Sequence, residues 1–224
     1  MKVAIVQFPG TNCDYDTQYA FNELGCETKI LWHQEETIDS DTDLLVIAGG
    51  FSYGDYLRSG AIARFSPIMK AVATYAGKGG KVLGICNGFQ VLTESHLLPG
   101  ALKRNEHLHF ISKHHHLKVA TTDNTFLANM DKDEVVNIPI AHHDGNFYID
   151  SDSLKELYEN DQVLLHYCDE NGIISNPNGS VNAIAGICNT EKNVFGLMPH
   201  PERAMESILG SSDGRKMLEG FLNV

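Results

Sequence analysis

The sequence of 224 residues predicts an α/β fold: an open, mostly parallel sheet with helices on both faces and antiparallel strands at one edge. The first half of the chain alternates short apolar runs with helix-compatible stretches, which is the βαβ rhythm of a parallel sheet. The apolar runs are continuous rather than alternating, as is typical of strands that are covered on both sides. The length and the lack of an internal boundary predict a single domain over residues 1–224.

The first half of the chain holds the predicted parallel strands and their helices. Helices are expected over Tyr15–Leu24 and Ile62–Tyr75, and a shorter one over Phe89–Ser95. The predicted strands are Val3–Phe8, Thr28–Trp32, Leu44–Ala48 and Val82–Ile85.

After Pro99-Gly100 the segments become shorter and more polar, which favours antiparallel strands at one edge of the sheet. Turn dipeptides over Glu170–Ser180 predict a long surface loop. The predicted edge strands are Leu108–Ser112, Leu117–Thr121 and Val135–Ala141, and further strands are expected at Val163–Cys168, Ala183–Cys188 and Val194–Met198.

Charge and cysteine content exclude several classes of function. A net charge of −12 argues against binding to nucleic acid or to an anionic membrane surface. The start of the chain does not resemble a signal peptide, and no apolar stretch is long enough to cross a bilayer. Five cysteines, an odd number without a C-x-x-C pair, indicate a reducing compartment, so we expect a cytoplasmic protein.

The segment Gly84–Gly88 carries the strongest functional signal. The predicted strand Val82–Ile85 runs into Gly-x-Cys-x-Gly and then into a helix, which is the nucleophile-elbow pattern with sulfur in place of oxygen. Such a turn raises the Cys86 thiol above the sheet edge and directs the first helical N–H groups at its target. We therefore predict that Cys86 is a nucleophile; the alternative is a small apolar residue packed beneath the turn.

A base for this thiol is predicted in Pro199–Arg203. His200 follows the last predicted strand, so it should emerge at the carboxyl edge of the sheet, where α/β proteins form their sites. Prolines on both sides fix its backbone, and Glu202 can accept a hydrogen bond from the imidazole and set its tautomer. The alternative is a rigid turn in which Glu202 only begins the next helix.

Two glycines after another predicted strand suggest an oxyanion site. Gly49-Gly50 follows Leu44–Ala48 and lets backbone N–H groups approach a ligand closely. The amides of Gly50 and Asn87 could together hold an oxyanion. A Gly-Gly pair after a strand is also common as a simple turn.

The remaining signals are weaker. His114–His116, with His107 and His109 nearby, suggests a metal, but successive residues of a strand point to opposite faces, so we predict no metal site. His142 ends an apolar run and is either a substrate contact or a polar strand end. No phosphate-binding loop is recognisable, and Lys78–Lys81 does not fit one.

Two segments together resemble the signatures of class I, triad-type glutamine amidotransferases: Gly84–Gln90 and Pro199–Arg203. Within that class, Gly49–Arg58, Pro9–Asp14 and Ile138–His142 resemble the small glutaminase subunits of phosphoribosylformylglycinamidine (FGAM) synthases. The resemblance extends from Val3 to about Leu222. It implies a flavodoxin-like open sheet.

The resemblance also implies residue roles. Cys86 would attack the side-chain amide of L-glutamine and form a γ-glutamyl thioester, while His200, oriented by Glu202, would shuttle protons. The amides of Gly50 and Asn87 would hold the oxyanion. Substrate contacts would come from Gln90 and from His142; the latter precedes His143-Asp144-Gly145, where the family pattern has Gly-Glu-Gly.

The resemblance implies partners as well. FGAM synthesis needs ATP, yet this chain shows no phosphate loop, so no cofactor is expected here, and ATP and Mg²⁺ are expected on a large synthetase subunit. A small bridging subunit is also implied, and Tyr53–Arg64 is expected to face the partner. The alternative functions are a stand-alone cysteine hydrolase or peptidase of the related α/β superfamily, and an inactive regulatory subunit.

Overall fold

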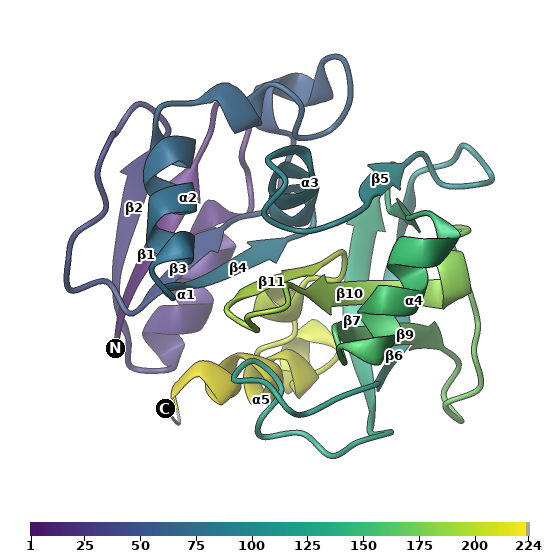
Figure 1. Ribbon diagram of the computed structural model, residues 1–224. Coiled ribbons are helices and arrows are strands. Elements are labelled where there is room, and N and C mark those ends of the chain that lie inside the picture. The colour runs from purple at the N-terminus through teal and green to yellow at the C-terminus, as the bar shows by residue number, and fades with distance from the viewer. Residues whose placement is uncertain (223–224) are drawn as a thin grey trace.

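A computed structural model describes residues 1–222, which contain a nine-stranded sheet in the order β2-β1-β3-β4-β11-β10-β9-β6-β7 (Figure 1). The first five strands in this order are parallel to one another. They are β2 Glu27–Trp32, β1 Lys2–Gln7, β3 Leu44–Ile47, β4 Lys81–Ile85 and β11 Val194–Leu197. The last four of these are almost fully buried, as predicted, whereas the edge strand β2 buries only Leu31, because no strand covers its outer side.

The other four strands are antiparallel, which confirms the predicted antiparallel edge. They are β10 Ile184–Cys188, β9 Val163–Cys168, β6 Ile111–Val119 and β7 Val135–His142. A separate antiparallel pair joins β5 Ala101–Lys103 to β8 Asn146–Tyr148.

Helices cover both faces of the parallel region (Figure 1). The crossovers β1-α1-β2 and β3-α2-β4 run in opposite directions along the sheet, so right-handed connections place α1 and α2 on opposite faces. Helix α1 contacts β1 and β2, whereas α3 contacts β3, β4 and β11. The helices are α1 Asp14–Glu23, α2 Ile68–Gly77, α3 Asn87–Glu94, α4 Ser151–Glu159 and α5 Asp213–Glu219.

Short 3₁₀ turns fill several connections between these elements. They are η1 Ser52–Asp55, η2 Ala63–Phe65, η3 Val181–Ala183, η4 Pro201–Arg203, η5 Ser207–Leu209 and η6 Gly220–Leu222. Within residues 1–222, no helix has both the length and the apolar character needed to cross a membrane.

Two predicted elements differ from the structure. The helix expected over Ile62–Tyr75 is split into η2 and α2, because Pro67 lacks an N–H and Ser66 before it is extended (ψ 144°). The strands expected over Leu108–Ser112 and Leu117–Thr121 are one strand, β6, which pairs with β7 on one side and β9 on the other.

The sheet brings the ends of three neighbouring parallel strands together. Ile47 of β3 is paired with Gly84 of β4, and Ile85 of β4 with Leu197 of β11. Because all three strands point the same way, the residues after them meet at one edge. The segments that follow contain Gly49-Gly50, Cys86 and His200, so the strand order alone gathers the predicted reactive groups.

Candidate active site

Cys86 occupies a strained turn between β4 and α3. Its backbone has φ 51° and ψ −104°, a conformation that residues other than glycine rarely adopt. The flanking glycines allow this turn: a Cβ added at Gly88 would lie 2.0 Å from the Ile47 carbonyl oxygen, and one at Gly84 would lie 2.5 Å from Leu92 Cδ1. The structure thus has the geometry of the predicted nucleophile elbow.

His200 and Glu202 lie beside this thiol, as predicted. His200 Nδ1 is 2.7 Å from Glu202 Oε1, and the two residues are only 1% and 2% exposed. His200 Nε2 is buried and has no hydrogen-bond partner within residues 1–222, while Cys86 is close enough to interact with the imidazole. The arrangement therefore leaves one ring nitrogen available for proton transfer.

The electrostatics of the site favour a charged imidazole. Burial alone lowers the pKa of His200, but the negative charges of Glu202 and of the Cys86 thiolate outweigh it, so the pKa is raised well above its usual value. His200 can then be protonated beside the Cys86 sulfur. Cysteine enzymes keep their sulfur nucleophilic by pairing a thiolate with such a cation.

The Gly49-Gly50 turn fits tightly against the loop that follows β1. The Cys13 N–H donates to the Gly49 carbonyl (3.1 Å), and the Phe51 N–H donates to the Gly10 carbonyl (3.1 Å). Gly50 has φ 140°, and a Cβ there would lie 2.6 Å from Asn12 N. The two loops therefore pack backbone against backbone beside the thiol.

Strand β7 closes the site from the far end of the sheet. The Cys86 thiol lies 3.6 Å from the Ala141 carbonyl oxygen, and the backbone N–H of His200 donates to the Pro139 carbonyl (2.8 Å). Strand β7 is the last strand of the sheet, five places from β4. The antiparallel part must therefore curl back over the strand ends, consistent with the strong twist of such strands.

Asn87 and Gln90 connect α3 to the loops around it. Asn87 Oδ1 accepts from the Ser52 N–H (2.9 Å), and Asn87 Nδ2 donates to Gln90 Oε1 (2.8 Å) and to Asp55 Oδ1 (3.2 Å). Gln90 Nε2 donates to the Asp144 carbonyl (2.7 Å). Both ends of the Gln90 amide are therefore engaged within the protein.

His142 is buried beneath the site. Its Nδ1 faces Asn105 Oδ1 at 3.1 Å, and that oxygen also accepts the Gly145 N–H (3.0 Å). Because Asn105 Nδ2 donates to the carbonyls of His142 and His109, the amide orientation is fixed and His142 Nδ1 must carry the proton. Burial, and then the charge of His200, lowers the pKa of His142 to about 4.

A second group of polar residues lies beside α3. Ser59 Oγ donates to Asp144 Oδ2 (2.8 Å), and His143 Nδ1 lies 3.1 Å from Asp144 Oδ1. Burial raises the pKa of Asp55 to about 6, and the charge of Asp144 adds to the rise. The departure from Gly-Glu-Gly at His143-Asp144 therefore changes residues that are part of this wall.

Arg58 belongs to an ion pair. Its Nε and Nη2 atoms donate to the two carboxylate oxygens of Glu94, at 2.5 and 2.7 Å, and Arg64 Nη1 donates to the Glu94 carbonyl (3.0 Å). These contacts fasten the 56–66 loop to the end of α3. Between them and η1, Leu57 remains 89% exposed.

The histidine-rich segment lies on β6, where the side chains alternate. His115 is buried and its Nε2 faces the Ser175 carbonyl (3.1 Å), whereas His114 is exposed. The three adjacent histidines are thus divided between the two faces of the strand. The single potential metal-ligand group found within residues 1–222 is Cys13, His200 and Glu202.

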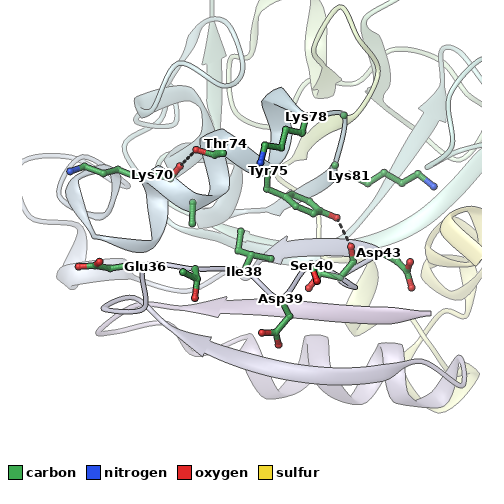
Figure 2. Close-up of a pocket in the computed structure, with 15 residues that line it drawn as sticks. Glu36, Ile38, Asp39, Ser40, Asp43, Lys70, Thr74, Tyr75, Lys78 and Lys81 are labelled. Atoms are coloured by element: carbon green, nitrogen blue, oxygen red, sulfur yellow. Dashed lines mark hydrogen bonds between the residues drawn. The ribbon is translucent and has the colours of Figure 1, made fainter.

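A large groove of about 800 Å³ lies elsewhere (Figure 2). It is lined by residues of α2 and of the segments before β3 and β4, so it lies near the sheet edge opposite Cys86. Tyr75 donates to the Thr42 carbonyl across it (3.1 Å), while Lys70, Lys81 and Asp39 point in different directions (Figure 2). No convergent polar set marks this groove as a ligand site.

Several residues of the site were not predicted from the sequence. Asn105 is fully buried and holds the wall around His142, and nothing in its local sequence indicated this. Arg203 Nη2 contacts Cys13 Sγ (3.2 Å) and its Nε pairs with Asp16 (2.9 Å), so it ties η4 to α1. Cys13 and Arg203 lie inside segments that already carried the family resemblance, which was the available signal.

Comparison with known proteins identifies the family. The profile of the CobB/CobQ-like glutamine amidotransferase domain matches residues 1–219. Phosphoribosylformylglycinamidine synthase subunit PurQ of Sulfurimonas denitrificans is 76% identical over 222 residues, 99% of either chain, and that of Wolinella succinogenes is 62% identical over 221 residues, also 99% of either chain. A chain in the structure of PurLQS from Thermotoga maritima is 40% identical, with a TM-score of 0.89 over 99% of this chain and 97% of that one. The chain therefore belongs to the CobB/CobQ-like glutamine amidotransferase family, which confirms the predicted resemblance to glutamine amidotransferases.

Proposed function

We propose that this chain is the glutaminase subunit of an FGAM synthase. It hydrolyses L-glutamine and passes the ammonia to a synthetase subunit, which uses ATP to convert formylglycinamide ribotide to formylglycinamidine ribotide. One observation carries the chemistry: Cys86 sits on a strained elbow beside His200, whose Nδ1 is 2.7 Å from Glu202. The 76% identity to a phosphoribosylformylglycinamidine synthase subunit supports the choice of reaction.

The first half-reaction forms a thioester. The Cys86 thiolate attacks the carboxamide carbon of glutamine, and the carbonyl electron pair moves onto oxygen, where the amides of Gly50 and Asn87 stabilise it. As the C–N bond breaks, His200 gives its Nε2 proton to the departing nitrogen, which leaves as ammonia. Glu202 holds the imidazole in the required orientation.

The second half-reaction releases glutamate. His200, now neutral, removes a proton from water as the water oxygen attacks the thioester carbon. The C–S bond then breaks and restores the Cys86 thiolate and the imidazolium. A pKa of about 4 keeps His142 uncharged at neutral pH, so the site holds only one cationic imidazole.

Gln90 and His142 affect glutamine binding indirectly, because they hold the residues that line its pocket. Both ends of the Gln90 amide are used by Asn87 and Asp144, so Gln90 positions the 144 loop rather than offering a free donor. His142 is held by Asn105 in the same wall. We therefore assign both residues to shaping the glutamine pocket.

The ammonia is used by another chain. We propose that this chain needs no cofactor of its own, that ATP and Mg²⁺ bind the large synthetase subunit, and that a small subunit bridges the two. A cytoplasmic location fits this role, and the five free cysteines support it.

The segment Tyr53–Arg64 is the proposed partner face. Tyr56 and Leu57 are 75% and 89% exposed, and exposed apolar side chains near a site favour protein contacts. Arg58→Glu would place a second carboxylate against that of Glu94 and would disturb the loop itself. Leu57→Asp is the cleaner variant, and we expect it to weaken complex formation about tenfold, with Ile208→Asp, also at an 89% exposed position, as the control.

The decisive experiment separates glutamine use from ammonia use. In the complete complex, Cys86→Ser should reduce glutamine-dependent FGAM formation by at least about 10³-fold while ammonia-dependent formation persists. Cys26→Ser, at a buried cysteine outside the site, is the control. A glutamine-analogue electrophile should label Cys86 alone, as detected by mass spectrometry.

Other outcomes identify the alternatives. Unchanged glutamine hydrolysis in Cys86→Ser would exclude this mechanism. Hydrolysis of peptides without partners would favour a stand-alone cysteine hydrolase, and a wild-type complex that uses only ammonia would indicate an inactive regulatory subunit.

A further inference from the structure

We propose that the loop His107–Phe110 forms a second docking surface for the synthetase subunit, joined to the Tyr53–Arg64 face through Phe51. The surface is apolar at its centre and positively charged at its margin. It therefore fits a partner surface that is apolar and flanked by carboxylates. The proposal rests on the proposed function for the identity of the partner.

The loop presents two large apolar side chains to solvent. Leu108 is largely exposed and Phe110 is about half-exposed. Phe110 stacks on Phe51, with ring centroids 6.5 Å apart, and Phe51 is itself about half-exposed. Because Phe51 belongs to the same connection as the exposed Leu57, apolar side chains from two separate segments of the chain adjoin.

Buried groups hold the backbone of this loop in place. Asn105 is fully buried, its Nδ2 donates to the His109 carbonyl (2.8 Å), and its own carbonyl accepts the Leu108 N–H (2.8 Å). His143 Nε2 lies 3.3 Å from the Leu108 carbonyl oxygen. A fixed backbone thus presents the apolar side chains, which lowers the conformational entropy that a partner must remove on binding.

The backbone at Leu108 departs from what leucine prefers. Its φ is 56°, in the left-handed region that glycine and asparagine occupy more readily. A short polar residue would fit this turn better and would leave no apolar side chain in water. Leucine is therefore present at a conformational cost, which favours a role for its side chain in a contact outside this chain.

The margin of the loop is positively charged, although the whole chain carries a net charge of −12. Lys103 and Arg104 precede the loop, Lys113 follows it, and all three are exposed. None of the three has an ion-pair partner within residues 1–222, and Glu106 is the only carboxylate between Lys103 and Lys113 in the sequence. Unpaired positive charge of this kind attracts a surface that presents carboxylates.

The position of the loop identifies the partner. Asn105 Nδ2 also donates to the His142 carbonyl (2.9 Å), and the preceding Ala141 carbonyl oxygen lies 3.6 Å from the Cys86 thiol. The Phe51 ring comes directly after the glycine turn of the site. The apolar surface therefore borders the place where ammonia is released, and a chain that uses this ammonia must cover it. We assign the surface to the synthetase rather than to a second copy of this chain for that reason.

The first experiment removes the exposed leucine without disturbing the turn. Leu108→Asn should unfold in urea at a midpoint equal to or above that of wild type, because asparagine accepts a positive φ. Its dissociation constant for the preassembled synthetase and bridging subunits, measured by fluorescence anisotropy of the labelled chain, should rise at least about tenfold. Ile173→Asn is the matched control and should bind as wild type, because Ile173 is 65% exposed and Leu108 66%.

Charge reversal provides the second test. Arg104→Glu should weaken assembly most at low ionic strength, and its affinity should depend less on salt than that of wild type between about 50 and 300 mM NaCl. Lys70→Glu makes the same change in net charge at an exposed lysine of the groove near the opposite sheet edge, and it should bind as wild type. Equal weakening by the two reversals would exclude a local acidic contact.

Three further results would overturn the proposal. Wild-type binding by Leu108→Asn, while Leu57→Asp weakens assembly, would confine the synthetase to the Tyr53–Arg64 face and would leave the proposed function intact. A change in the sedimentation of the isolated chain in Leu108→Asn would make the loop a contact between copies of this chain. If the wild-type chain bound no synthetase at all, the proposed function would fail together with this inference.

Discussion

The parallel and antiparallel regions contribute to the site in different ways. In the parallel region, the reactive residues follow the ends of β3, β4 and β11, and close backbone contacts at Gly84 and Gly88 fix the elbow. In the antiparallel region, buried side chains such as Asn105 hold loops by hydrogen bonds to backbone groups.

The difference shows how chemistry and recognition are divided. Regular strands place the thiol and its base, because strand order and register determine where strand ends meet. Irregular loops form the wall that receives substrate, and buried amides satisfy their backbone groups. Substitutions in the first region should therefore reduce turnover, and those in the second should alter glutamine affinity.

The largest effect is expected where the base is oriented. Glu202→Gln removes the carboxylate that lies 2.7 Å from His200 Nδ1, and we expect glutamine-dependent activity to fall by about 10²- to 10³-fold. The measurement is kcat for ammonia release in the complex. Glu206→Gln, a few residues on and paired with Tyr19, should change kcat less than about twofold. Equal effects of the two substitutions would contradict the assigned role.

The next effect concerns the elbow's packing. Gly88→Ala places a Cβ 2.0 Å from the Ile47 carbonyl oxygen, and we expect it to lower the free energy of unfolding by about 3 kcal/mol. Gly77→Ala is the matched control, because nothing lies within 4 Å of its added Cβ. Urea denaturation measures both, and similar midpoints for the two variants would show that α3 can move away from β3.

A comparable substitution in the antiparallel region should act on recognition. Asn105→Ala removes the donors to His109 and His142 and the acceptor for Gly145, so we expect a loss of about 2 kcal/mol in the free energy of unfolding. The KM for glutamine should rise more than kcat falls. Asn171→Ala, on an exposed loop, is the control. A collapse of kcat at unchanged KM would place Asn105 with the reactive groups instead.

The smallest effect is a pH dependence at Asp55. Burial raises its folded-state pKa to about 6, above the usual value, so its stabilising contribution is present below about pH 4 and is lost as the pH rises through 6. Asp55→Asn removes this dependence. Relative to the variant, wild type should lose about 1 kcal/mol of unfolding free energy between pH 4 and 7, a figure reduced for partial exposure. A difference that does not vary with pH would contradict the assignment.

The sequence predicted the parallel region closely. Leu44–Ala48 was expected as a strand and β3 spans Leu44–Ile47, because continuous apolar runs identify doubly covered strands. The elbow could be predicted too, because the glycines on either side of Cys86 are neighbours in the sequence. The break before α2 could also have been predicted, since Pro67 cannot donate a helical hydrogen bond.

The antiparallel wall could not be predicted in this way. Ala141 and Pro139 meet Cys86 and His200 only because β7 curls back across several strands, and no local pattern encodes that curl. Asn105 was not identified because a buried asparagine and a loop asparagine look alike in sequence. The roles of the predicted site residues remain predictions that the experiments above test.

The fit between Gly50 and Asn12 has a consequence for how such sequences diverge. A side chain at Gly50 would lie 2.6 Å from Asn12 N, so the backbone path of one loop restricts the residues that the other can carry. Segments 38 positions apart should therefore be exchanged between homologues as one unit. Chimaeras that swap both loops should retain the fold, whereas those that swap one should express poorly.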